Sequence, residues 1–188
     1  MKQADIIKQL SDKELKKQLL FSQSIFLLLA IGLSLFFFNS FFRWFALFQW
    51  ELDQILMYGV FPALGLVVIE LIIYSILPPH LFDDGGINER IFKDQSITWI
   101  ICICFIVAVS EEALFRGVIQ TSFGFIFASS IFALIHVRYL KKPILFIFIL
   151  VTSFGIGYLY YQTGNILVTM TFHFIVDALL GLVIRFKK

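Results

Sequence analysis

Two adjacent glutamates and an arginine stand in the middle of a long apolar stretch. Glu111 and Glu112 follow the uncharged run 97–110, and Arg116 lies four residues after Glu112. An ionisable side chain at the centre of a membrane helix costs roughly 2.5–3.5 kcal/mol by the lower estimates, so a chain seldom carries three for the fold alone. Residues four apart share a helix face, which lets Glu112 and Arg116 pair. Glu111 points about 100° away from Glu112 and is left free for chemistry.

Two later apolar stretches carry further polar residues at helical spacing. His136 follows Phe132 by four residues, and Asp177 follows His173 by four. Buried Glu, His and Asp residues build reactive sites, and they also build proton or ion pathways. We rank a pathway last, because no second chain of acids leads from these residues to the other membrane face. Glu70 has no partner at helical spacing, and we give it low weight.

The composition places the chain in a membrane. Of its 188 residues, 60% are hydrophobic and only 15% are charged, whereas a soluble domain carries about 25% charged residues. The formal net charge of +2 is small, which argues against a nucleic-acid partner.

Cys102 and Cys104 lie two apart in one apolar helix, so we expect them to pack in the core instead of forming a disulfide framework.

Hydropathy predicts an all-α polytopic membrane helix bundle of about six transmembrane helices. We expect a cytoplasmic amphipathic segment over residues 1–19 and a single membrane-embedded domain over residues 20–188. The fourth helix is short, which leaves five or seven helices open. The expected spans are 20–38, 55–77, 97–120, 123–137, 143–161 and a sixth that ends at residue 184.

The basic residues are consistent with six helices and both termini in the cytoplasm. In that topology only Arg43 falls in an outer loop, and such a bias marks the cytoplasmic side. We therefore expect a site whose cavity opens to the cytosol. The cytoplasmic loops and tails would hold Lys2, Lys8, Lys13, Lys16, Lys17, Arg90, Lys93, Arg138, Lys141, Lys142, Arg185, Lys187 and Lys188.

These motifs resemble a known family. Residues 111–116 resemble the EExxxR motif of the CPBP (Abi) intramembrane proteases, which include the prenyl-protein CAAX endopeptidase and bacteriocin-processing homologues. Residues 132–136 match the family's FxxxH motif, and residues 173–177 match its Hxxx(N/D) motif. Each motif alone is weak, but all three occur in order on separate predicted spans. The resemblance covers about residues 83–182.

The resemblance implies an endopeptidase that cleaves peptide bonds of membrane-associated peptides or proteins. It makes Glu111 the general base that activates a water molecule. It gives His136 the task of holding or polarising that water. Glu112, Arg116 and Phe132 would then be structural residues around the reacting groups.

The resemblance also assigns an oxyanion-binding role to His173 and Asp177. This sequence departs here from the CAAX endopeptidase branch, which has asparagine at the position of Asp177. An amide donates a hydrogen bond, whereas an ionised carboxylate does not. Asp177 must therefore be protonated, orient His173, or ligate a metal.

The cofactor is left open by the residues. If a divalent metal such as zinc takes part, Glu111, His136 and His173 would supply a set of two histidines and one carboxylate. The HExxH spacing of many zinc proteases is absent, and we favour hydrolysis without a tightly bound metal.

A different class of function is the alternative to a protease. The chain would then be a non-catalytic immunity or scaffold protein that regulates a partner membrane protein. Under either hypothesis we expect an integral protein of a bacterial plasma membrane. Its expected partners are membrane lipids and a peptide or protein substrate with a membrane-proximal cleavage site, with no nucleic acid.

Overall fold

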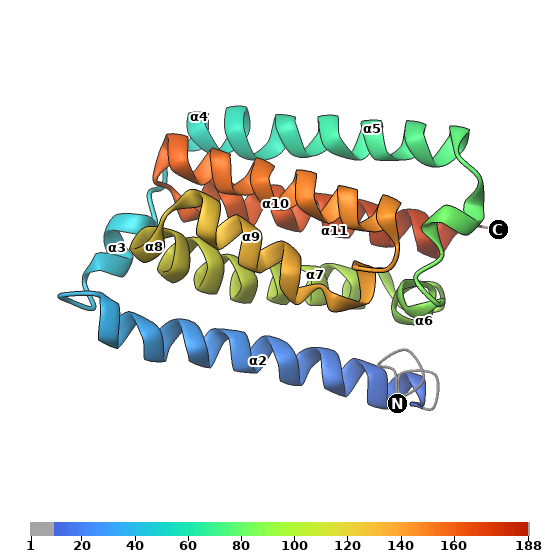
Figure 1. The fold of residues 1–188 in the computed structure, drawn as a ribbon, viewed down its shortest axis with the longest axis horizontal. Helices are drawn as coiled ribbons and strands as arrows, with labels where there is room; N and C mark the ends of the chain where they lie inside the picture. The colour runs from blue at the N-terminus through green and yellow to red at the C-terminus, as the bar shows by residue number, and fades with distance from the viewer. Residues whose placement is uncertain (1–9, 188) are drawn as a thin grey trace.

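The computed structural model describes residues 10–187, and all regular elements within this range are helices (Figure 1). Elements η1 and η3 are π-helical, and η2 and η4 are short 3₁₀ helices. The elements in chain order are α2 (Asp12–Phe37), α3 (Arg43–Leu47), α4 (Leu52–Gln54), η1 (Ile55–Val60), α5 (Phe61–Ile76), η2 (Pro79–Phe82), α6 (Ile87–Phe92), α7 (Ile97–Glu112), η3 (Ala113–Gln120), α8 (Thr121–Phe123), α9 (Phe125–Ile135), η4 (Val137–Tyr139), α10 (Pro143–Thr163) and α11 (Ile166–Phe186).

The prediction of an all-α polytopic membrane bundle is confirmed. Within residues 10–187, 5 helices are long and apolar enough to cross a membrane: Asp12–Phe37, Leu52–Ile76, Ile97–Phe123, Pro143–Thr163 and Ile166–Phe186. The expected fourth span corresponds to α9, which is apolar but has only 11 residues. The protein is therefore an integral membrane protein, while the cytoplasmic placement of both termini stays a prediction.

The first span begins earlier than the sequence suggested. Helix α2 starts at Asp12, inside the segment expected to precede the membrane domain, and residues 1–9 of that segment lie outside the described residues. Ser11 caps the helix, because its side chain accepts from the backbone N–H of Glu14 while the Glu14 carboxylate accepts from Ser11. This capping box lets the charged turns after Ser11 continue directly into the apolar part of one helix.

The helices form an elongated bundle with α2 along one side and α5 along the opposite side (Figure 1). Helices α7, α9, α10 and α11 lie between these two. Helix α11 contacts α7, α5, α10 and η1, and α2 contacts α7 and η3. The last span is thus in the middle of the bundle, next to the third span that carries the glutamates.

Small residues bring these helices close together, as is common in membrane bundles. A Cβ at Gly117 would lie 2.8 Å from the ring of Trp44, and one at Gly157 would lie 2.3 Å from Ser129 Oγ and 2.9 Å from the ring of Phe125. These contacts seat the short α3 against η3 and α9 against α10. Helices α9 and α10 also contact η3, so these three elements meet around Arg116.

The third span changes its winding at the glutamates. Glu112 is the last residue of α7, and the π-helix η3 continues the same span without a break. Such π-helical segments are rare and frequently occur at functional sites. The hydrophobic periodicity of the sequence did not predict this change.

The close contact at Gly157 gives a stability prediction with a matched control. We expect Gly157→Ala to lower the melting temperature in detergent micelles, because the added methyl group must displace Ser129 or Phe125 at a cost of about 1–3 kcal/mol. Gly155→Ala is the control, since nothing lies within 4 Å of its added Cβ. On helix propensity alone, alanine at either position would stabilise α10 by up to about 1 kcal/mol. Equal melting temperatures of the two variants would contradict the packing at Gly157.

Candidate functional site

The buried ion pair predicted from sequence is present. Arg116 Nη1 donates to Glu112 Oε1 at 3.1 Å, and both side chains have no exposed surface. Glu111 takes no part in this pair and lines a cavity instead. The two adjacent glutamates therefore have different surroundings, as their positions on the helix predicted.

Arg116 also contacts two neighbouring helices, α9 and α10. Its Nη2 donates to the carbonyl of Ser153 in α10 at 2.8 Å, and its guanidinium lies 4.5 Å from the ring centre of Phe132 in α9. At the same point Ser153 Oγ donates to the carbonyl of Ser129 at 2.8 Å. One cation thus joins η3, α9 and α10 through an ion pair, a backbone carbonyl and an aromatic face.

His173 on α11 lies among three carboxylates. Its Nδ1 is 2.8 Å from Glu112 Oε1, and its Nε2 is 3.4 Å from Asp177 Oδ2 and 4.0 Å from Glu111 Oε2. A carboxylate accepts hydrogen bonds, so Nδ1 donates to Glu112. Glu112 therefore does more than offset Arg116, because the same oxygen also orients His173. The sequence did not predict this contact.

Asp177 lies beside His173, as their helical spacing predicted. This contact is compatible with the alternative in which Asp177 orients the imidazole. A direct contact of Asp177 with a substrate carbonyl stays a prediction. The Asp177 side chain is 35% exposed, so it is the more accessible member of this pair.

His136 lies just past the end of α9, where the chain leaves the helix with φ −77° and ψ 52°. Its Nδ1 is 2.8 Å from the carbonyl oxygen of Phe132. Because a carbonyl only accepts, Nδ1 carries the hydrogen and Nε2 of the neutral ring is an acceptor. The Phe132 ring packs near both histidines, with its centre 5.0 Å from that of His136 and 6.1 Å from that of His173.

The predicted site residues face one cavity of about 740 Å³. Its lining includes Glu111, His136, His173 and Asp177, and it also includes Glu70, the acid without a partner at helical spacing. Three separate spans and the end of α9 thus bring their polar side chains to the same space. The sequence predicted this convergence, and the structure shows it.

The described residues do not include a ready metal site. Among residues 10–187, no three His, Cys, Asp or Glu side chains are arranged to hold a metal ion. Glu111, His136 and His173, the ligands named if a metal takes part, are therefore not preformed as a ligand set. We derive no step through a metal.

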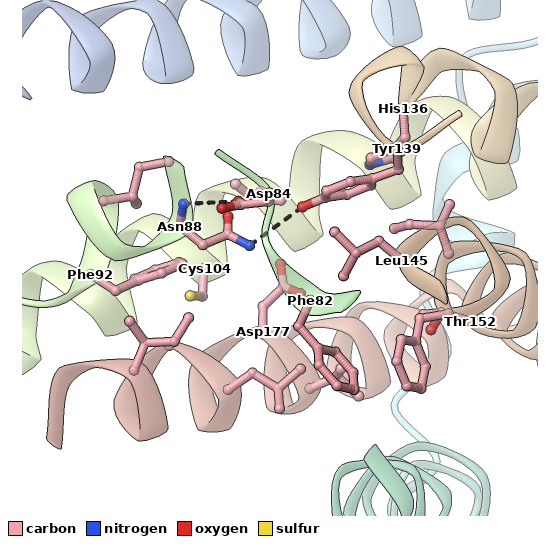
Figure 2. Close-up of a pocket in the computed structure, with 18 of the residues that line it drawn as sticks. Phe82, Asp84, Asn88, Phe92, Cys104, His136, Tyr139, Leu145, Thr152 and Asp177 are labelled. Carbon is pink, nitrogen blue, oxygen red and sulfur yellow. Dashed lines mark hydrogen bonds between the residues drawn. The ribbon is translucent and has the colours of Figure 1, made fainter. Parts of the chain in front are cut away.

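Two loops meet at the polar part of the cavity wall (Figure 2). Asp84 accepts from the backbone N–H groups of Ile87 and Asn88, both at 3.0 Å, and so begins α6. Arg138 donates to Asn88 Oδ1 at 3.1 Å, and Asn88 Nδ2 donates to the hydroxyl of Tyr139 at 3.4 Å. These bonds join the connection between the second and third spans to the loop after α9.

The comparisons with known proteins agree with the motifs. The family described as type II CAAX prenyl endopeptidase, Rce1-like, matches residues 93–179, which contain all three motifs. The uncharacterized protein YpbD of Bacillus subtilis (strain 168) is 46% identical over 134 residues, which cover 71% of each chain. The chain belongs to the Rce1-like family. This confirms the resemblance to CPBP intramembrane proteases, although no solved structure matches the chain.

One polar contact of this Rce1-like protein comes from outside the matched segment. Gln23 in α2 donates through Nε2 to Glu111 Oε1 at 3.2 Å, and Ser110 Oγ donates to Gln23 Oε1 at 2.6 Å. Neither Gln23 nor Ser110 was predicted from the sequence as a site residue. An amide near the start of the apolar first span was the available signal, because polar groups inside a membrane need hydrogen-bond partners.

The buried ion pair generates a second stability prediction. Arg116→Met should lower the free energy of unfolding by about 3–5 kcal/mol, because Glu112 then remains buried without its cation. The double variant Glu112→Gln/Arg116→Met should be less destabilised, since a neutral amide replaces the uncompensated charge. Thermal unfolding in detergent micelles measures both.

Arg43→Met is the matched control for the loss of an arginine. Arg43 is exposed, and we expect its replacement to change stability by less than about 0.5 kcal/mol. A double variant as unstable as Arg116→Met alone would show that the buried charge of Glu112 is not the cause.

Proposed function

We propose that this protein is an intramembrane endopeptidase that hydrolyses peptide bonds of membrane-associated proteins with a water activated by Glu111. The observation that carries the proposal is that the two adjacent glutamates have different surroundings. Glu112 is bound by Arg116 and His173, whereas Glu111 faces the cavity that His136, His173 and Asp177 also line. Membership in the Rce1-like family supports protease activity.

The first chemical step begins with a water held between Glu111 and His136. In the neutral form of His136 the hydrogen lies on Nδ1, which donates to the Phe132 carbonyl, and Nε2 accepts a hydrogen bond from this water. Glu111 takes a proton from the water as its oxygen attacks the peptide carbonyl carbon. The carbonyl oxygen then carries the developing negative charge.

His173 is the group we assign to that developing charge. Glu112 holds its Nδ1, which directs Nε2 towards Glu111 and Asp177. A ring that carries both protons donates through Nε2 to the oxyanion. Asp177 then serves as an orienting residue, since an ionised carboxylate has no hydrogen to donate.

Collapse of the tetrahedral intermediate completes the reaction. The carbon–nitrogen bond breaks, and Glu111 returns the proton it received to the leaving nitrogen. The products are a new carboxylic acid, which keeps the second proton of the water, and a new amine, and these ionise in water to a carboxylate and an ammonium group. Each proton is accounted for by Glu111 and the water, and Glu111 ends in its starting state.

The surroundings of the cavity support a substrate that reaches the site from the cytoplasmic side of a bacterial plasma membrane. Basic residues such as Arg138, Lys93 and Lys187 line the cavity, and basic residues mark the cytoplasmic side. The relative from Bacillus subtilis supports a bacterial setting. A peptide with a membrane-proximal cleavage site and the surrounding lipids are the partners that this placement favours.

The decisive prediction concerns Glu111→Gln. We expect this variant to lose cleavage by at least about 100-fold, because an amide cannot take the proton from water. It should remain folded, since glutamine keeps the shape and an oxygen to accept from Gln23. Comparing membrane-protein fragments in cells that express wild type or variant measures the loss and reveals the substrate.

Glu51→Gln is the matched control, because Glu51 is exposed and does not line the cavity. Its fragments should equal those of wild type. Unchanged fragments in Glu111→Gln would refute the proposed role. A cellular phenotype that persists in Glu111→Gln would instead favour the non-catalytic scaffold function.

A further inference from the structure

The side chain of Gln23 is buried between two helices and is hydrogen-bonded at both ends of its amide. Only 4% of the residue is exposed. Its Nε2 donates to Glu111 Oε1, and its Oε1 accepts from the hydroxyl of Ser110, the residue just before Glu111. An ionised carboxylate only accepts hydrogen bonds, so the amide nitrogen is the end that faces Glu111. Ser110 Oγ also lies 2.7 Å from the carbonyl oxygen of Ile106, so its single hydrogen is shared between that oxygen and Gln23 Oε1.

The bond from Gln23 distinguishes the two oxygens of Glu111. Oε1 is occupied by the amide, while Oε2 is the oxygen that lies 4.0 Å from His173 Nε2. Within residues 10–187, the side-chain hydrogen bond to Glu111 comes from Gln23. Glu112 is held differently, by Arg116 and His173 from within the matched segment.

We propose that Gln23 is a positioning residue for Glu111, and this proposal rests on the proposed hydrolytic function. Nε2 of Gln23 holds Oε1 and thereby turns Oε2 towards the reacting water and His173. Ser110 contacts the oxygen end of the amide and supports the orientation that presents a donor to Glu111. The first span, which lies outside residues 93–179 matched by the family, would thus take part in the alignment of the base.

A purely structural role is the competing explanation, because buried amides also join membrane helices. The two roles predict different kinetics. Loss of helix packing lowers stability, whereas loss of alignment lowers kcat with little change in KM. A displacement of a reacting group by about 1 Å can reduce a rate by about 100-fold.

Gln120 offers a matched control. It is 6% exposed, and its Nε2 donates to the carbonyl of Gly157 at 2.7 Å. Gln120 therefore joins η3 to α10 with a buried amide but does not line the cavity. Gln23→Leu and Gln120→Leu each remove one such amide at similar volume.

The experiment compares wild type, both leucine variants and Glu111→Gln in proteoliposomes. The substrate is the membrane protein whose fragments disappear in cells that express Glu111→Gln, and melting temperature is measured in parallel. We expect Gln23→Leu to lower kcat by at least about 10-fold with KM within about 2-fold. Gln120→Leu should lose stability but keep the wild-type kcat.

A second variant covers the case in which Gln23→Leu does not fold. Ser110→Ala preserves the amide but removes the donor that orients it, and we expect a loss of kcat of about 3-fold or more. Wild-type kcat in folded Gln23→Leu overturns the proposal. If Gln23→Leu is unfolded, wild-type kcat in Ser110→Ala overturns it.

Failure of this proposal can be separated from failure of the proposed function. An inactive Glu111→Gln together with a fully active Gln23→Leu would retain the hydrolytic function and remove only the role of Gln23. Unchanged fragments in Glu111→Gln would remove both.

Discussion

A guanidinium without exposed surface needs partners on several sides, and Arg116 finds them on three helices. Glu112 neutralises it, the carbonyl of Ser153 accepts from it, and the ring of Phe132 lies against its face. The arrangement of the site depends on this cation. The Phe132 ring in turn packs near both histidines, and the Phe132 carbonyl accepts the hydrogen bond from Nδ1 of His136. Glu112, held by Arg116, orients His173.

The contacts that the sequence predicted are those that depend on residue spacing along one helix. Glu112 and Arg116, and also His173 and Asp177, lie four residues apart and are in contact. The membrane spans followed from hydropathy, although α2 begins earlier and α9 is shorter than expected. Helical geometry specifies which residues share a face, so pairs within one span can be inferred without a fold.

Contacts between different spans could not be predicted from residue spacing along one helix. The bond from Gln23 to Glu111 joins residues 88 positions apart, and the bond from His173 to Glu112 joins residues 61 apart. No period in the sequence encodes the rotation of one helix against another. The π-helical winding after Glu112 was also unpredicted, because it alters hydrogen bonding without changing the apolar character of the span.

The location of the ion pair within a single span affects how the protein can enter a bilayer. Glu112 and Arg116 approach each other as soon as their own helix has formed, before any neighbouring span is present. A nascent helix that carries both can therefore partition into lipid with its two charges already matched. Glu111 has no such partner on its own helix and gains its bond from Gln23 through the first span. That span is synthesised earlier, so the bond is available when the third span arrives.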